Sequence, residues 1–188
     1  MSNTKHSHAL VIGIGNNGRG DDGLGWAFIE AIRKAGYLGD TVLRYQLQVE
    51  DAELISRYQS VLFVDAYKPR LREGFEISIC IPANDFSFST HQLSPASVLC
   101  LCRELYQTEP QTYLMLISGR DWRLQLSLST FAKNNLDSAT NFFYANCQKS
   151  LSEVAPKLFP DLSGSCNYPL KSGPSSHGHF STDSSRKA

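Results

Sequence analysis

Short apolar runs alternate with helical patterns along most of this chain. Ala9–Ile12, Val61–Val64 and Thr112–Ile117 are too short for helices and are dominated by apolar residues, which is typical of buried parallel strands. Thr41–Leu47 and Phe75–Ile81 alternate between apolar and polar residues, so we expect strands there too, the second one exposed or antiparallel. These segments predict the strands of one sheet.

Helical patterns fill the segments between those strands. Apolar residues recur at helical spacing from Leu24 to Ala35, before Gly36, and Glu50–Arg57 predicts one short helix. Ser94 and Pro95 form a typical helix start, and Asn135–Leu158 predicts a closing helix. Alternating strands and helices indicate an α/β sandwich with a largely parallel sheet. Right-handed crossovers then place the second and third strands on opposite sides of the first, which creates a ligand crevice between the first and third.

A glycine-rich turn follows the first strand and leads into two aspartates, Asp21 and Asp22. Gly13, Gly15 and Gly18 match the dinucleotide fingerprint G-x-G-x-x-G, but two carboxylates in the first helical turn would repel a pyrophosphate. The acidic residue that the fingerprint needs about 20 residues later is also missing. One aspartate can be explained as a helix cap. Two adjacent aspartates favour a cation at this turn.

Asp22, Asp65 and His91 form the candidate site. The two aspartates are expected just past the carboxyl ends of the first and third strands, so they should face each other, and His91 is the one histidine away from the polar ends of the chain. Two carboxylates and one imidazole suit an open divalent-metal site. The alternative is that His91 is an ordinary polar residue of its loop. No G-x-S-x-G, H-E-x-x-H or G-x-x-x-x-G-K-[ST] pattern occurs.

Length and composition limit the remaining function classes. The 188 residues suit one domain, residues 1–162, followed by a Ser-rich tail, residues 163–188, that we expect to be disordered. Lys and Arg balance Asp and Glu at 18 each, which predicts no nucleic-acid or membrane partner. The start of the chain lacks a signal-peptide core, and the five cysteines have no paired C-x-x-C spacing. We therefore expect a cytoplasmic protein with reduced thiols.

Three motifs carry a family resemblance. With G-I-G-N-x-x-R-G-D-D-G-L-G at Gly13–Gly25, V-D-A at Val64–Ala66 and the single His91, the chain resembles the hydrogenase maturation proteases. Residues 46–54 and 91–110 are most similar to the branch that serves bidirectional, NAD-linked hydrogenases. Gly18, where the family usually carries a bulky apolar residue, and Ser118–Trp122, where it has a glycine-and-acid pattern, depart from the family.

The resemblance implies a fold, an activity and a set of ligands. The fold is a three-layer α/β/α sandwich with a five-stranded, mostly parallel twisted sheet and one antiparallel strand. The activity is an endopeptidase that removes the C-terminal peptide of a [NiFe] hydrogenase large-subunit precursor after nickel insertion. Asp22, Asp65 and His91 then match the metal-binding set, which is also the catalytic set.

In that interpretation the substrate carries the nickel, which serves as the recognition signal. Other divalent ions, such as cadmium or zinc, can occupy the same ligands, and no organic cofactor is needed. We expect a monomer. Two alternatives stay open: a Rossmann-type nucleotide-binding module, and a metal-binding maturation chaperone without peptidase activity.

Overall fold

The computed structural model describes residues 7–83 and 93–147. His91, the loop around it and the Ser-rich tail predicted at residues 163–188 lie outside the described residues. The strands are β1 (Ser7–Ile14), β2 (Asp40–Arg44), β3 (Tyr58–Tyr67), β4 (Phe75–Ile79) and β5 (Gln111–Ser118). The helices are α1 (Leu24–Lys34), α2 (Glu50–Ile55), α3 (Pro95–Tyr106) and α4 (Thr130–Cys147).

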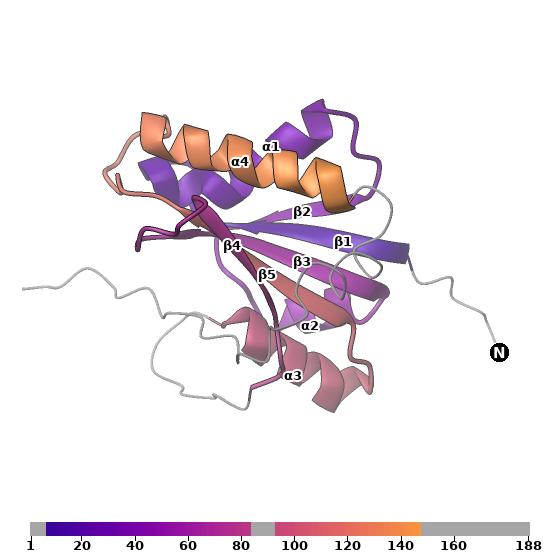
Figure 1. The fold of residues 1–188 in the computed structure, drawn as a ribbon. Helices are drawn as coiled ribbons and strands as arrows, with labels where there is room; N and C mark the ends of the chain where they lie inside the picture. The colour runs from indigo at the N-terminus through magenta and orange to yellow at the C-terminus, as the bar shows by residue number, and fades with distance from the viewer. Residues whose placement is uncertain (1–6, 84–92, 148–188) are drawn as a thin grey trace, which may run out of the picture.

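One five-stranded sheet in the order β2-β1-β3-β5-β4 forms the middle layer. All neighbouring strands run parallel except β4, which is antiparallel to β5. Figure 1 shows α1 and α4 covering one face of the sheet and α2 and α3 covering the other. The predicted three-layer α/β/α architecture, with one antiparallel strand, is confirmed.

Burial on both faces explains the unbroken apolar runs. In β1, Leu10 and Ile12 pack on the side of α2 and α3, whereas Val11 packs on the side of α1 and α4. In β3, Val61 and Phe63 alternate with Leu62 in the same way. Because successive strand side chains point to opposite faces, a strand covered on both sides needs apolar residues at every position.

Several predicted boundaries are wrong. The strands expected at Thr41–Leu47 and Phe75–Ile81 end earlier, at Arg44 and Ile79. The strand expected to end before Asp65 continues to Tyr67, because β3 keeps its pairing with β5 through Tyr67 and Ser118. The closing helix begins at Thr130 instead of Asn135, because the hydroxyl oxygen of Ser129 accepts a bond from the N–H of Ala132 and so caps it.

Four of the five cysteines lie in the described part of the chain. Cys80, Cys100 and Cys102 are buried, and Cys147 is the last residue of α4. Within the part of the chain that the structure describes, no helix combines the length and apolar character needed to cross a bilayer.

Candidate functional site

The carboxyl ends of β1 and β3 bring the first candidate residue into place. Gly13 pairs with Val64 in the last register position between these strands. Asp65 therefore lies one residue beyond the β1 ladder, while its own strand continues beside Leu116 of β5. Its side chain is only 1% exposed, and its Oδ1 accepts a 2.7 Å hydrogen bond from the N–H of Ala66. This is the topological switch point that the strand order predicts.

Asp22 lies on the neighbouring turn. A 3-10 helix, Gly20–Gly23, connects the glycine-rich turn to α1, and Asp22 is half-buried within it. Its Oδ2 accepts a 3.1 Å bond from the N–H of Asn16. The N-cap residue of α1 is Gly23, and no side chain caps that helix. The interpretation of one aspartate as a helix cap is therefore wrong.

Gly15 lies between the backbone of Asp22 and the side chain of Asp65. A Cβ atom added to Gly15 would lie 1.9 Å from the carbonyl oxygen of Asp22 and 3.9 Å from Oδ1 of Asp65. The backbone of Gly15 also has a φ of +134°, which L side chains rarely adopt. A glycine at this position lets the turn and the end of β3 approach closely. Asp22 and Asp65 thus border the same small region.

The third candidate, His91, lies outside the described residues, so the three-residue site stays a prediction. Among residues 7–83 and 93–147, no three His, Cys, Asp or Glu side chains are grouped closely enough to hold a metal ion. The described part of the site is Asp65 in β3, one residue past the β1 ladder, and Asp22 in the 3-10 helix before α1.

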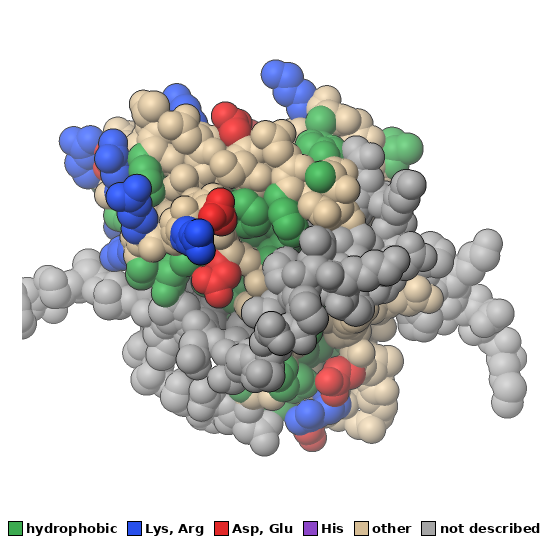
Figure 2. All heavy atoms as spheres, in the orientation of Figure 1, with side chains coloured by type: hydrophobic (Ala, Val, Ile, Leu, Met, Phe, Trp, Pro, Cys, Tyr) green, Lys and Arg blue, Asp and Glu red, His purple; other side chains and the backbone are tan. Residues whose placement is uncertain are grey.

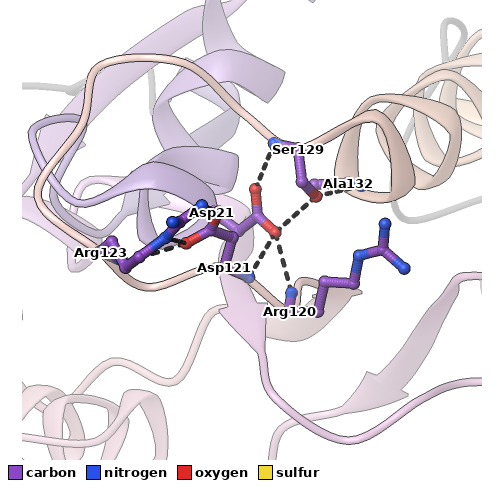
Figure 3. A network of polar contacts seen from close by, with 6 residues as sticks. All are labelled: Asp21, Arg120, Asp121, Arg123, Ser129 and Ala132. Atoms are coloured by element: carbon purple, nitrogen blue, oxygen red, sulfur yellow. Dashed lines mark hydrogen bonds and ion pairs between the residues drawn. The ribbon is translucent and has the colours of Figure 1, made fainter.

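Asp21 has a different role from its neighbour Asp22. Its side chain is fully buried and accepts four hydrogen bonds (Figure 3). Oδ2 accepts from the N–H groups of Arg120 (2.8 Å) and Asp121 (2.9 Å) and from the hydroxyl of Ser129 (2.8 Å). Oδ1 accepts from the N–H of Ser129 at 2.7 Å. All of these donors belong to the segment between β5 and α4.

These bonds keep the Asp21 carboxylate ionised. Burial alone would raise the pKa of Asp21, because it removes the charge from water. The bonds from the main chain of Arg120, Ser129 and Asp121 and from the Ser129 hydroxyl outweigh that effect and hold the pKa below its ordinary value of 3.8. Asp21 is therefore a buried structural anion.

Residues 119–129, called here the 119–129 loop, are fastened to the glycine-rich turn by main-chain bonds as well. The N–H of Gly20 donates to the carbonyl of Gln125 at 2.7 Å, and the N–H of Gln125 donates to the carbonyl of Gly18 at 3.0 Å. The N–H of Asp21 donates to the carbonyl of Asp121 at 2.7 Å. Sequence reasoning missed this connection, although Ser129 is a typical helix cap and could have indicated where α4 starts.

The same turn has few amides left for a phosphate. The N–H of Asn16 bonds to Asp22, the N–H of Gly18 to the side chain of Asn16, and the N–H of Arg19 to the carbonyl of Asn16. The N–H groups of Gly20 and Asp21 bond to the 119–129 loop. A dinucleotide site needs such amides to point at the pyrophosphate. This geometry argues against the fingerprint interpretation.

Comparison with known proteins identifies the fold. No protein-family model matches the chain, and no curated protein matches it in sequence. A [NiFe] hydrogenase maturation protease HycI from Thermococcus kodakarensis KOD1 superposes with a TM-score of 0.58 at 24% identity, covering 74% of this chain and 91% of that one. The hydrogenase maturating endopeptidase HybD from E. coli gives 0.55 at 19% identity, covering 73% and 90%.

A hydrogenase 2 maturation peptidase from Thaumarchaeota archaeon SCGC_AB-539-E09 gives a TM-score of 0.53 at 22% identity, covering 73% of this chain and 97% of that chain. Structural similarity at such low sequence identity is evidence for the fold alone. The described chain has the α/β fold of the hydrogenase maturation proteases.

Proposed function

We propose that this protein is a hydrogenase maturation endopeptidase, which removes the C-terminal peptide of a [NiFe] hydrogenase large-subunit precursor. The observation that carries the proposal is Asp65, one residue past the β1 ladder, with Asp22 in the turn that follows β1, in a fold shared with maturation proteases. The three sequence motifs of the family resemblance include both residues.

The proposed recognition step uses nickel held by the precursor. Asp22, Asp65 and His91 supply two carboxylates and one imidazole, which are acceptable ligands for nickel. A set of three ligands leaves coordination positions for groups of the substrate, so the protein can recognise the metal while the precursor keeps it bound. The ligation positions the precursor so that its C-terminal segment lies against the enzyme.

The test is a cleavage assay on the purified precursor, followed as a gel shift. Asp22→Asn, Asp65→Asn and His91→Ala should each slow processing of the nickel-loaded precursor at least about 100-fold, because replacing even the outer partners of metal ligands costs about 10–100-fold. Asp137→Asn, the same chemical change at an exposed position of α4, is the matched control and should process normally. Wild-type rates in the folded ligand variants would refute the assignment of the site.

Nickel-free precursor separates the mechanism from the activity. It should be processed slowly by the wild-type protein; equal processing with and without nickel would remove the recognition mechanism but leave the peptidase. A protein that binds the precursor and never cleaves it would instead be a maturation chaperone.

Nucleotide binding is tested by calorimetry with NAD, NADP and ATP. Because the amides of the glycine-rich turn are bonded internally and two aspartates adjoin them, we expect no heat of binding at millimolar ligand. Binding of any of these nucleotides would revive the Rossmann-type alternative.

A further inference from the structure

Two leucines are displayed on the 119–129 loop. Leu124 and Leu126 are each 85% exposed, although both are large apolar side chains. Gln125 between them bonds to the glycine-rich turn through both its N–H and its carbonyl. The backbone between the two leucines is therefore fixed to the glycine-rich turn, while the leucine side chains remain exposed to solvent.

Hydrogen bonds to Asp21 fix both ends of this loop. Asp21 binds its beginning at Arg120 and Asp121 and its end at Ser129. Gly119 packs closely against the Asp21 side chain, since an added Cβ atom would lie 2.6 Å from Cβ of Asp21. A loop that is ordered by the protein itself presents a preformed surface, which lowers the entropic cost of binding a partner.

Basic side chains are frequent on the loops at this edge of the sheet. Because β1, β3 and β5 are parallel, the loops after them lie at one edge of the sheet, and Lys68 after β3 lies over the ring of Trp122 in the 119–129 loop, 5.6 Å from its centre. Figure 2 shows Lys and Arg side chains beside hydrophobic ones on this side of the domain. The exposed basic residues of the three loops are Arg19, Lys68, Arg70, Arg72, Arg120 and Arg123.

Acidic side chains offset this charge only in part. Glu73 is exposed and lies 3.5 Å from Arg72, and Asp121 is paired with Arg123 at 2.6 Å. Asp21 and Asp65 are buried, and Asp22 at the same edge is half-buried. The whole chain has equal numbers of acidic and basic residues, so the excess of positive charge at this edge is a local feature.

We propose that the 119–129 loop, with the basic residues around it, is a docking surface for a peptide segment that carries leucine-like and acidic side chains. The exposed leucines favour an apolar partner, and the basic residues at this edge favour an anionic one. Resting on the proposed function, the segment belongs to the protein substrate. A nucleic acid would satisfy the cations but leave both leucines exposed.

The experiment measures binding without cleavage. Two fluorescein-labelled peptides of equal length, one of leucine, glycine and glutamate and one of leucine, glycine and lysine, are titrated with the full chain and followed by fluorescence anisotropy. The glutamate peptide should bind at least about tenfold more tightly than the lysine peptide, and added salt should reduce the difference. Equal affinity for the two peptides, or binding of neither, would overturn the proposal.

Matched variants locate the surface. Leu124→Ser/Leu126→Ser should weaken binding of the glutamate peptide at least about tenfold, because each leucine loses most of its apolar contact area. Leu124→Met/Leu126→Met should preserve binding. Leu38→Ser changes a leucine that is 98% exposed between α1 and β2, at the opposite edge of the sheet, and should have no effect. If Leu38→Ser weakens binding as much as the double serine variant does, the proposal is wrong.

Charge is tested in the same way. Arg19→Glu should weaken binding of the glutamate peptide, whereas Lys34→Glu, at the end of α1 on the opposite edge, should not. Equal effects of the two substitutions would refute local recognition. Failure of the precursor to be cleaved would contradict the proposed function but not this surface, because the peptide assay does not depend on cleavage.

Discussion

Replacing Asp21 by asparagine should lower the free energy of unfolding by about 2–4 kcal/mol. The asparagine oxygen can take the place of Oδ2 and still accept from Arg120, Asp121 and the hydroxyl of Ser129. The amide NH₂ group of the asparagine then faces the N–H of Ser129, which in the wild type donates to Oδ1 at 2.7 Å. The variant therefore loses one charge-assisted hydrogen bond and places two buried N–H donors against each other. The three hydrogen bonds that remain become weaker, because their acceptor is no longer charged.

The measurement is urea unfolding at neutral pH, with free energies extrapolated to water. Asp137→Asn is the control, because it makes the same change at an exposed position and should stay within about 0.5 kcal/mol of the wild type. If Asp21→Asn also stays within that range, the four bonds do not stabilise the fold, and the account of Asp21 as a buried structural anion is wrong.

The loss of stability at acidic pH provides a second test on the wild type and Asp21→Asn. The folded-state pKa of Asp21 lies below its ordinary value of 3.8, so between the two values the unfolded chain binds more protons than the folded protein. The stabilisation by Asp21 is present above about pH 4 and is lost as the pH falls through the folded-state pKa. The gap between wild type and Asp21→Asn should therefore narrow under acid; a gap that widens would contradict the lowered pKa.

Two further predictions concern Gly15 and Cys102. Gly15→Ala should destabilise the protein by more than about 3 kcal/mol, because the new Cβ atom would meet the carbonyl of Asp22 at 1.9 Å. Gly36→Ala, with a φ of +90° but nothing within 4 Å, should cost only about 1–2 kcal/mol, and equal melting temperatures of the two variants would refute this reasoning. Burial raises the pKa of Cys102, so its alkylation by iodoacetamide, followed by mass spectrometry, should be at least about tenfold slower in the folded protein than in urea. Equal rates would show that this thiol is accessible.

Much of the fold could be predicted because a strand that is buried on both faces consists of an unbroken run of apolar residues. The apolar runs at Ala9–Ile12 and Val61–Val64 lie within β1 and β3, and the strand order around β1 follows from right-handed crossovers. Strand ends were harder to predict. Asp65 is an internal residue of β3 because β3 stays paired with β5 beyond the end of the β1 ladder. The local sequence around Asp65 does not indicate this pairing.

The candidate site divides in the same way. Gly15 lies next to the backbone of Asp22 and near the carboxylate of Asp65, and the three-residue site with His91 stays a prediction. The partners of Asp21 could not be predicted, because Arg120 and Ser129 lie 99 and 108 residues further along the chain. Such contacts depend on how the 119–129 loop crosses the end of the sheet, which residue spacing does not encode.

Adjacent aspartates at one turn therefore serve two different physical purposes. Asp21 is fully buried, accepts four hydrogen bonds and fixes the 119–129 loop, whereas Asp22 stays half-buried beside Asp65. Because Asp21 has all its bonds within the protein, its substitution should appear mainly as lost stability. Substitution of Asp22 should appear mainly as lost metal engagement, with the fold retained. Comparing unfolding and precursor processing in Asp21→Asn and Asp22→Asn separates these roles, and two variants with the same pattern of losses would show that the aspartates act as one unit.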